Sequence, residues 1–262
     1  MVKVICVANQ KGGVGKTTTA VNLSASLAAA EKRTLLIDCD PQANATSGLG
    51  MNREQIAKSL YQVIIGKESL AGIICPTELD FLQLVPSAQE LIGAEIELVS
   101  EISRETKLKE ALSSLTNKFE FIILDCPPSL GLLTINALTA AGSVLIPVQC
   151  EYYAMEGLSQ LLKTIKLVTR SLNSALAIEG FLLTMFDSRN NLCHQVADEV
   201  REHFQERVFK TIVHRNVRLS ESPSYGKPII LYDISSKGAS NYMDLAGEII
   251  AKTGESTERR SN

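Results

Sequence analysis

Two lysines and three glycines gather in the stretch VANQKGGVGKTTTAVNL, residues 7–23. A phosphate-binding loop of the form G-x-x-x-x-G-K-[ST] would be anchored on Lys16 and Thr17, but it requires a glycine where this chain has Gln10. Lys16 is placed to reach the β- and γ-phosphates of a nucleotide held by the loop. Lys11 is a second ammonium at the outer end of the loop, where it could lie in solvent or reach a partner subunit.

The glycine loop lies between two segments of different character. The apolar run VKVICVA precedes it, and TTTAVNLSASLAAA, which is rich in alanine and has helical spacing, follows it. In the order strand, loop, helix, the N–H groups of the loop and the helix N-terminus converge on one anion. We therefore expect the phosphates to be bound by Lys11, Gly12, Gly13, Val14, Gly15, Lys16, Thr17 and Thr18.

Aspartates end two further apolar runs. Asp38 and Asp40 close TLLIDCD, and Asp125 lies in FIILDCPP, which has the form of a Walker B strand. An aspartate at the end of a strand is often a helix cap or turn residue. Because ligands collect at the carboxyl ends of parallel strands, the glycine loop favours a Mg²⁺ site with Thr17 as a direct ligand and Asp125 acting through the water shell.

Strand-like and helix-like segments alternate along the chain, which predicts an α/β fold with a doubly wound, mostly parallel sheet flanked by helices. The expected strands are VKVICVA, TLLIDCD, FIILDCPP, SVLIPVQ, IEGFLLTMF and KPIILYD. The expected helices are residues 88–115, 132–141, 155–172, 192–206 and 239–252. We expect one domain over residues 1–252 and a disordered polar tail over 253–262.

Composition narrows the function classes. The net charge of −3 argues against a uniformly basic nucleic-acid binder, and the absence of Trp with only 5% aromatics favours a core of Val, Ile, Leu and Ala. The six cysteines form no C-x-x-C pair, so we expect reduced thiols, and the three histidines are not spaced as a metal site. With no signal peptide or membrane span visible, we expect a cytoplasmic protein.

Several motifs together resemble one family. KGGVGKTT resembles the deviant Walker A box of the ParA/MinD superfamily of P-loop NTPases. LLIDCDPQANATSGLG and FIILDCPPSLG resemble the switch regions of ParA partition ATPases, and the likeness extends through HRNVRLSESPSYGKPIILYD, over about 240 residues in all. The resemblance implies a cytoplasmic, ATP- and Mg²⁺-dependent ATPase of slow intrinsic turnover, for the partition of chromosomes or plasmids.

The resemblance also implies roles for single residues. Lys11 would act across an ATP-dependent homodimer, and Asp40 would position or activate the attacking water. Asp40 and Asp125 would also belong to the Mg²⁺ site with Thr17. The implied base contacts are Asp187, Arg215 and Asn216. The chain departs from the family pattern at Ala43 (usually Gly), His214 (usually Pro) and Tyr225 (usually His).

The implied partners are a ParB-like activator and non-specific double-stranded DNA, which would associate the protein with the nucleoid in its ATP state. The stretch 207–218 contains four basic residues and no acid, and Arg189 resembles a family position associated with DNA contact. A basic run is more often a solvated face, but the resemblance favours DNA. The expected DNA-binding residues are Arg189, Arg207, Lys210, Arg215 and Arg218.

Three other functions compete with partition. A MinD-like division-site regulator would need a C-terminal amphipathic basic helix for lipid, but this chain ends AGEIIAKTGESTERRSN, so we expect no membrane binding. An iron–sulfur carrier would need paired cysteines, but Cys126 and Cys150 are scattered single residues. A metabolic P-loop enzyme, such as a small-molecule kinase or amide ligase, would need a substrate domain or lid, and neither is evident in the sequence. The first strand begins at Val2, so no helix-turn-helix for operator binding is expected.

Overall fold

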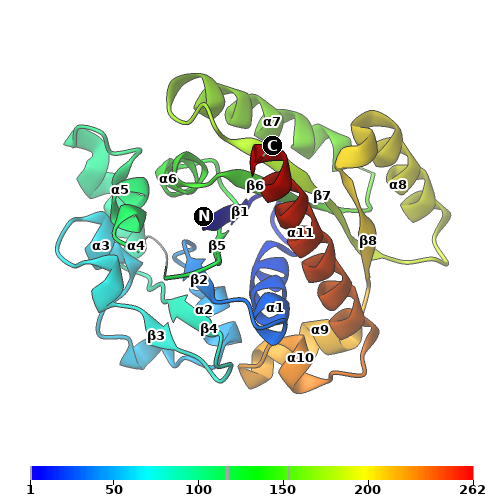
Figure 1. The fold of residues 1–262 in the computed structure, drawn as a ribbon, viewed down its shortest axis with the longest axis horizontal. Helices are drawn as coiled ribbons and strands as arrows, with labels where there is room; N and C mark the ends of the chain where they lie inside the picture. The colour runs from blue at the N-terminus through cyan, green and yellow to red at the C-terminus, as the bar shows by residue number, and fades with distance from the viewer. Residues whose placement is uncertain (1, 116–117, 153, 262) are drawn as a thin grey trace.

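The structure is a computed structural model that describes residues 2–115, 118–152 and 154–261. The strands of this part form one sheet in the order β3-β4-β2-β5-β1-β6-β7-β8, with helices on both sides (Figure 1). Neighbouring strands are parallel except β3 and β4. The predicted α/β, doubly wound, mostly parallel architecture is confirmed.

The strands are short at the centre and longer toward the β8 edge. Their bounds are β1 Lys3–Val7, β2 Thr34–Asp38, β3 Cys75–Pro76, β4 Leu82–Val85, β5 Phe121–Asp125, β6 Ser143–Gln149, β7 Ala177–Phe186 and β8 Val208–His214. The α-helices are α1 Lys16–Ala29, α2 Asn44–Gly48, α3 Leu60–Ile64, α4 Leu91–Glu97, α5 Lys107–Ser113, α6 Leu132–Ala140, α7 Ala154–Ser171, α8 Asn191–Phe204, α9 Val217–Glu221, α10 Ile229–Tyr232 and α11 Lys237–Ser261. Short 3₁₀ turns are η1 Arg53–Gln55, η2 Leu70–Gly72, η3 Leu98–Ser100, η4 Gln205–Arg207 and η5 Ser222–Tyr225.

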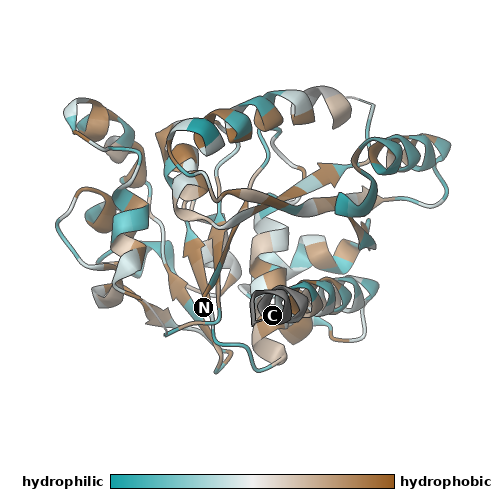
Figure 2. Ribbon diagram, turned by 45° about the horizontal axis from the view of Figure 1, so that its top comes forward, coloured by the Kyte–Doolittle hydropathy of each residue, from teal (hydrophilic) through white to brown (hydrophobic). Residues whose placement is uncertain are grey.

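Two apolar layers hold the helices on the sheet. Because successive strand residues point to opposite faces, Ile5 and Val7 of β1 pack in the layer beneath α1 and α11, and Cys6 packs in the layer on the other side. Hydrophobic residues follow the central strands in Figure 2, and hydrophilic residues gather on the outer helices and loops. The sheet is therefore a rigid support for the loops at its edges.

Two sequence predictions of local structure are wrong. KPIILYD is not a strand, because Pro228 precedes the short helix α10, whose Ile229 N–H donates to Asn22 Oδ1 at 2.7 Å. The helix predicted over 88–115 is interrupted, with α4 and α5 separated by η3 and a loop.

The structure also contains strands that the sequence did not predict, and one predicted boundary falls inside a helix. Strands β3, β4 and β8 were not predicted, although VFKTIVH in β8 alternates apolar and polar residues as a half-buried strand does. The boundary expected at residue 252 falls inside α11. The division into a domain of 1–252 and a tail of 253–262, whose last residue lies outside the described residues, stays a prediction.

Candidate nucleotide-binding site

The glycine loop joins β1 to α1 at the centre of the sheet. Gly13 has φ of 74° and Gly15 has φ of 87°, both in the left-handed region that favours glycine. Gly15 is also the N-cap residue of α1. This backbone turns the loop back over the helix N-terminus, where free N–H groups can surround a phosphate.

Lys16 lies inside this loop. Its Nζ donates to the backbone carbonyl of Lys11 at 2.9 Å, and the residue is only 7% exposed. Burial lowers the pKa of the Lys16 ammonium, although nearby Asp125 opposes that change. The ammonium is thus held at the position where a negative phosphate would best offset its desolvation.

Lys11 points away from the loop. Its Nζ forms an ion pair with Glu151 Oε2 at 2.7 Å, while its backbone N–H donates to Asn9 Oδ1 at 3.1 Å. Asn9 in turn donates to the carbonyl of Pro147 in β6 at 2.7 Å. The loop is therefore fixed to β6, and the two lysines have opposite orientations. No local motif marks Glu151, so this partner of Lys11 was not predicted.

The carboxyl ends of β2, β5 and β1 lie side by side below the loop. Asp38 is directly opposite Asp125 in the β2–β5 pair, and Asp125 is opposite Val7 in the β5–β1 pair. Asp38 accepts hydrogen bonds from the Thr46 N–H at 2.8 Å, the Thr46 hydroxyl at 2.7 Å and the Asp40 N–H at 3.1 Å. Burial raises the pKa of Asp38 to about 6. Asp38 thus anchors α2, a role that the sequence did not reveal.

Asp125 is fully buried, and neither of its carboxylate oxygens receives a well-formed hydrogen bond from the described residues, although the Thr17 hydroxyl acts on the carboxylate closely enough to lower its pKa. Burial, then the charge of Asp38, raise the pKa of Asp125 well above its usual value, against the opposing effects of Thr17 and Lys16. A buried carboxylate without a hydrogen bond is costly unless a cation accompanies it. Asp125 and the Thr17 hydroxyl therefore fit a bound, partly hydrated Mg²⁺.

Asp40 begins the turn from β2 to α2. It is 6% exposed, and its Oδ1 accepts from the Gln42 N–H at 2.9 Å. Ala43, three residues on, has φ of 51° and is buried, so a residue with a Cβ occupies a left-handed position. Ala43, where the family usually has glycine, is thus a site of backbone strain.

A cavity of about 280 Å³ adjoins Gly15 and Thr18 on the β7–β8 side. Arg215 and Asn216, two of the three expected base contacts, line it, and so does His214. Asp187 is not among its lining residues; its carboxylate binds Arg189 instead, with 3.0 Å to Nε and 2.9 Å to Nη2. Residues that the sequence did not point to also line the cavity: Thr184, Met185, Val213, Leu219, Ser220, Pro223 and Tyr242.

The basic residues expected to bind DNA do not all lie at the same end of the strands. Arg207 precedes β8 and Lys210 lies within it, whereas Arg215 follows the end of the strand. At about 3.3 Å per residue, Arg207 and Arg215 are roughly 25 Å apart along the chain. Arg189 and Arg218 follow the carboxyl ends of β7 and β8. The structure thus gathers Arg189, Arg215 and Arg218 near the nucleotide edge and leaves Arg207 at the far end.

Comparison with known proteins identifies the family of this chain. Residues 2–178 match the protein-family model described as an AAA domain. The chain is 57% identical over 258 residues to the chromosome partitioning protein ParA of Myxococcus xanthus, across 98% of this chain and 91% of that protein. The chain belongs to the ParA family of the ParA/MinD superfamily. This confirms the resemblance that the motifs indicated.

Other similar proteins bear different names. This ParA-family chain is 57% identical to the sporulation initiation inhibitor protein Soj of Bacillus subtilis, across 96% of this chain and 99% of Soj. It is 36% identical, with a TM-score of 0.84, to a crystal structure of cobyrinic acid a,c-diamide synthase from Mycobacterium smegmatis with bound ADP and magnesium. That match covers 95% of this chain and 94% of the other.

Within residues 2–115, 118–152 and 154–261, no His, Cys, Asp and Glu side chains cluster as a metal site of three or more. The Cys6 and Cys126 sulfur atoms are 3.2 Å apart, but both thiols are fully buried in the core. Among the same residues, no helix is long and apolar enough to cross a membrane.

Proposed function

We propose that this ParA-family chain is a partition ATPase, for chromosomes or plasmids, that hydrolyses ATP slowly in a Mg²⁺-dependent reaction. The opposite orientations of the two lysines carry the proposal: Lys16 lies within its own loop, and Lys11 points out of it. An ammonium presented outward beside a phosphate site fits a role toward the nucleotide of a second subunit. ATP binding and homodimer formation would then be one linked event.

Each part of the hydrolytic reaction has a candidate in the site. The loop N–H groups and Lys16 bind the phosphates, and Lys11 of each subunit neutralises charge on the phosphoryl group bound by the other. Thr17 and Asp125 hold Mg²⁺, which offsets phosphate charge when bound. Asp40, on the turn next to the strained Ala43, positions the attacking water. The base occupies the cavity lined by Arg215 and Asn216.

We expect the protein to bind double-stranded DNA. Arg189, Arg215 and Arg218 lie at the nucleotide edge, and a dimer would present two such sets on one rigid body. Contacts to phosphates carry no sequence information, so binding should be non-specific and strongly dependent on salt. The protein would be cytoplasmic, would associate with the nucleoid in its ATP state, and would be stimulated by a ParB-like activator.

The experiment measures ATP hydrolysis with and without Mg²⁺, and binding to two unrelated DNA duplexes with ATP and with ADP. The proposal predicts slow, Mg²⁺-dependent hydrolysis and equal binding to both duplexes in the ATP state only. Absence of hydrolysis, a strong preference for one duplex, or equal affinity in both nucleotide states would contradict it.

The name of one similar structure supports a second candidate, a small-molecule amide synthase. That match is 36% identical, whereas the two proteins named ParA and Soj are each 57% identical to this chain. Adding DNA and a ParB-like protein to the hydrolysis assay separates the candidates, because a synthase requires a carboxylic acid substrate and an amide nitrogen donor for turnover. Hydrolysis that DNA and a ParB-like protein stimulate without such substrates favours partition.

A further inference from the structure

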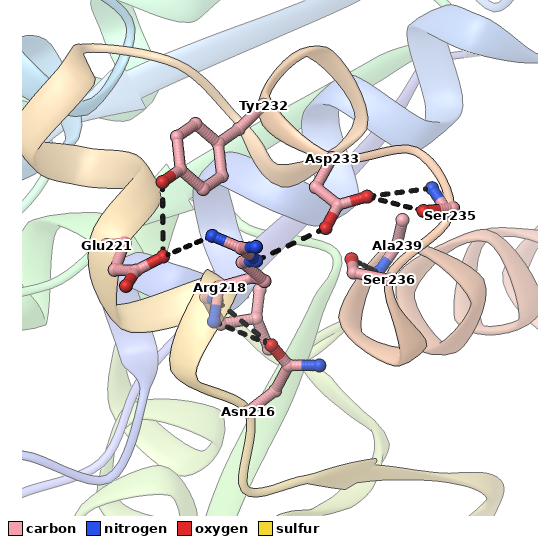
Figure 3. A network of polar contacts seen from close by, with 9 residues as sticks. Asn216, Arg218, Glu221, Tyr232, Asp233, Ser235, Ser236 and Ala239 are labelled. Atoms are coloured by element: carbon pink, nitrogen blue, oxygen red, sulfur yellow. Dashed lines mark hydrogen bonds and ion pairs between the residues drawn. The ribbon is translucent and has the colours of Figure 1, made fainter.

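Arg218 is held between two carboxylates of its own chain (Figure 3). Its Nη1 donates to Glu221 Oε2 at 3.0 Å, and its Nε lies 3.4 Å from Asp233 Oδ2. The two acids come from different elements, since Glu221 ends α9 and Asp233 follows α10. The Arg218 side chain is nevertheless 55% exposed, so an outside anion can reach it.

Both carboxylates are themselves fixed in place. The Tyr232 hydroxyl donates to the same Glu221 oxygen at 3.1 Å. The Ser235 N–H and hydroxyl donate to Asp233 Oδ1 at 3.1 and 2.7 Å. The acids are therefore a built feature of this surface, visible together in Figure 3, and another anion that approaches the arginine must compete with them.

Arg189 has the same arrangement with one acid. Asp187 binds its guanidinium through both carboxylate oxygens, and the arginine side chain is 88% exposed. Arg189 lowers the pKa of the Asp187 carboxyl to about 2. Residues 207–218 contain no acid, yet Arg218 pairs with two acids outside that stretch, and Arg189 pairs with its near neighbour Asp187.

We propose that Glu221 and Asp233 are competing counter-ions of Arg218, which DNA phosphate must displace, and that they hold the DNA affinity of this face low. Asp187 acts in the same way on Arg189. The inference rests on the proposed DNA binding and adds its regulation by the chain's own acids. Exposed ion pairs are weak, so phosphate can replace them, and removing one acid should tighten binding by about two- to fivefold.

The geometry of α9 makes Glu221 the best test position. Asn216, Leu219 and Ser220 line the nucleotide cavity, but Arg218 and Glu221 are not among its lining residues. In a helix, residues 219 and 220 face away from 218 and 221, as this division indicates. Neutralising Glu221 should therefore change DNA binding and leave nucleotide affinity unchanged.

The experiment compares Glu221→Gln and Asp233→Asn with the unaltered protein in a salt titration of binding to two unrelated duplexes with ATP. Both substitutions keep oxygen acceptors for Tyr232 and Ser235. Each should bind DNA about two- to fivefold more tightly and with a steeper salt dependence, because the freed arginine no longer exchanges one anion for another.

Glu105→Gln is the matched control. It also removes one negative charge and the carboxylate partner of an arginine, since Glu105 pairs with Arg104 at 3.0 Å. Glu105 lies two residues before α5, and α5 is far across the sheet from α9 in Figure 1. This variant should bind DNA as the unaltered protein does, which shows that position and not net charge is responsible.

The outcomes separate the two proposals. If the unaltered protein does not bind DNA with ATP even at low salt, the proposed function fails. If it binds, but Glu221→Gln and Asp233→Asn bind equally or more weakly, the inference is overturned and the acids orient Arg218 for phosphate instead. Equal gains in Glu105→Gln would also overturn it.

Discussion

The Nζ atom of Lys11 lies 2.7 Å from Oε2 of Glu151, which follows β6 in the same chain. The lysine proposed to act across a dimer is thus held by an acid of its own subunit. Their side chains are 36% and 47% exposed, and an exposed pair of this kind contributes about 0.2–1 kcal/mol. Transfer of Lys11 to a second subunit therefore requires only a small free energy.

Lys16→Ala and Lys11→Ala should have different effects. Loss of Lys16, whose ammonium lies within the loop, should abolish ATP binding. Loss of Lys11 should leave ATP binding to a single chain intact and stop turnover, because its ammonium points outward. Calorimetric titration with ATP and a turnover assay test this contrast. If both variants lost ATP affinity equally, Lys11 would serve its own subunit.

Asp40→Ala should retain ATP affinity and nearly abolish hydrolysis. The carboxylate lies on the turn after β2, outside the loop that binds phosphate, so only the water-positioning group is removed. A nucleotide-binding titration and single-turnover hydrolysis measure the two effects. Hydrolysis at the rate of the unaltered protein would show that Asp40 has no catalytic role.

The parts of the site that could be predicted from the sequence are those whose residues lie next to each other in the chain. The glycine loop and Asp125 are adjacent to the strands that position them, so short motifs were sufficient. Glu151 could not be found in this way, because only the fold brings it to Lys11, 140 residues earlier in the chain. For the same reason, the basic run near Arg218 gave no sign of Asp233. KPIILYD misled because its apolar residues suit a buried short helix as well as a strand.

Ala43→Gly should stabilise the protein. Ala43 has φ of 51°, which costs roughly 1–2 kcal/mol for a residue with a Cβ, while glycine adds roughly 0.5–1 kcal/mol of chain entropy to the unfolded state. The expected net gain in the free energy of unfolding is about 0.5–1 kcal/mol, measured by urea titration. Ala45→Gly, at a buried position inside α2, is the control and should destabilise by about 1 kcal/mol or more. If Ala43→Gly destabilised the protein, the backbone at Ala43 would not be strained.

Stability should fall as pH rises from about 4 to 6. The pKa of Asp38 is about 6 in the folded chain, above its ordinary value of 3.8, so in this window the folded state holds a proton that the unfolded state has released. The free energy of unfolding should therefore decrease by roughly 3 kcal/mol for this group and then level off. Asp125, whose pKa is also raised, adds a fall in the same direction.

Asp38→Asn isolates this contribution. Urea unfolding at pH 4.5, 5.5, 6.5 and 7.5 should show a smaller fall with pH than in the unaltered protein, and Asn keeps an oxygen acceptor for Thr46. Asp244→Asn, at an exposed position on α11, is the control and should leave the pH profile unchanged. An identical profile in Asp38→Asn would mean that this carboxyl does not hold a proton in the folded chain.

The most direct test of the central claim is the molar mass of the protein in solution, measured by light scattering with ATP, with ADP and without nucleotide. Asp40→Ala should be included, because slow hydrolysis in it would preserve the ATP state. The account predicts a dimer only with ATP, most completely in Asp40→Ala, and a monomer in all three conditions for Lys11→Ala. A monomer with ATP, or the same dimer in every nucleotide state, would contradict it.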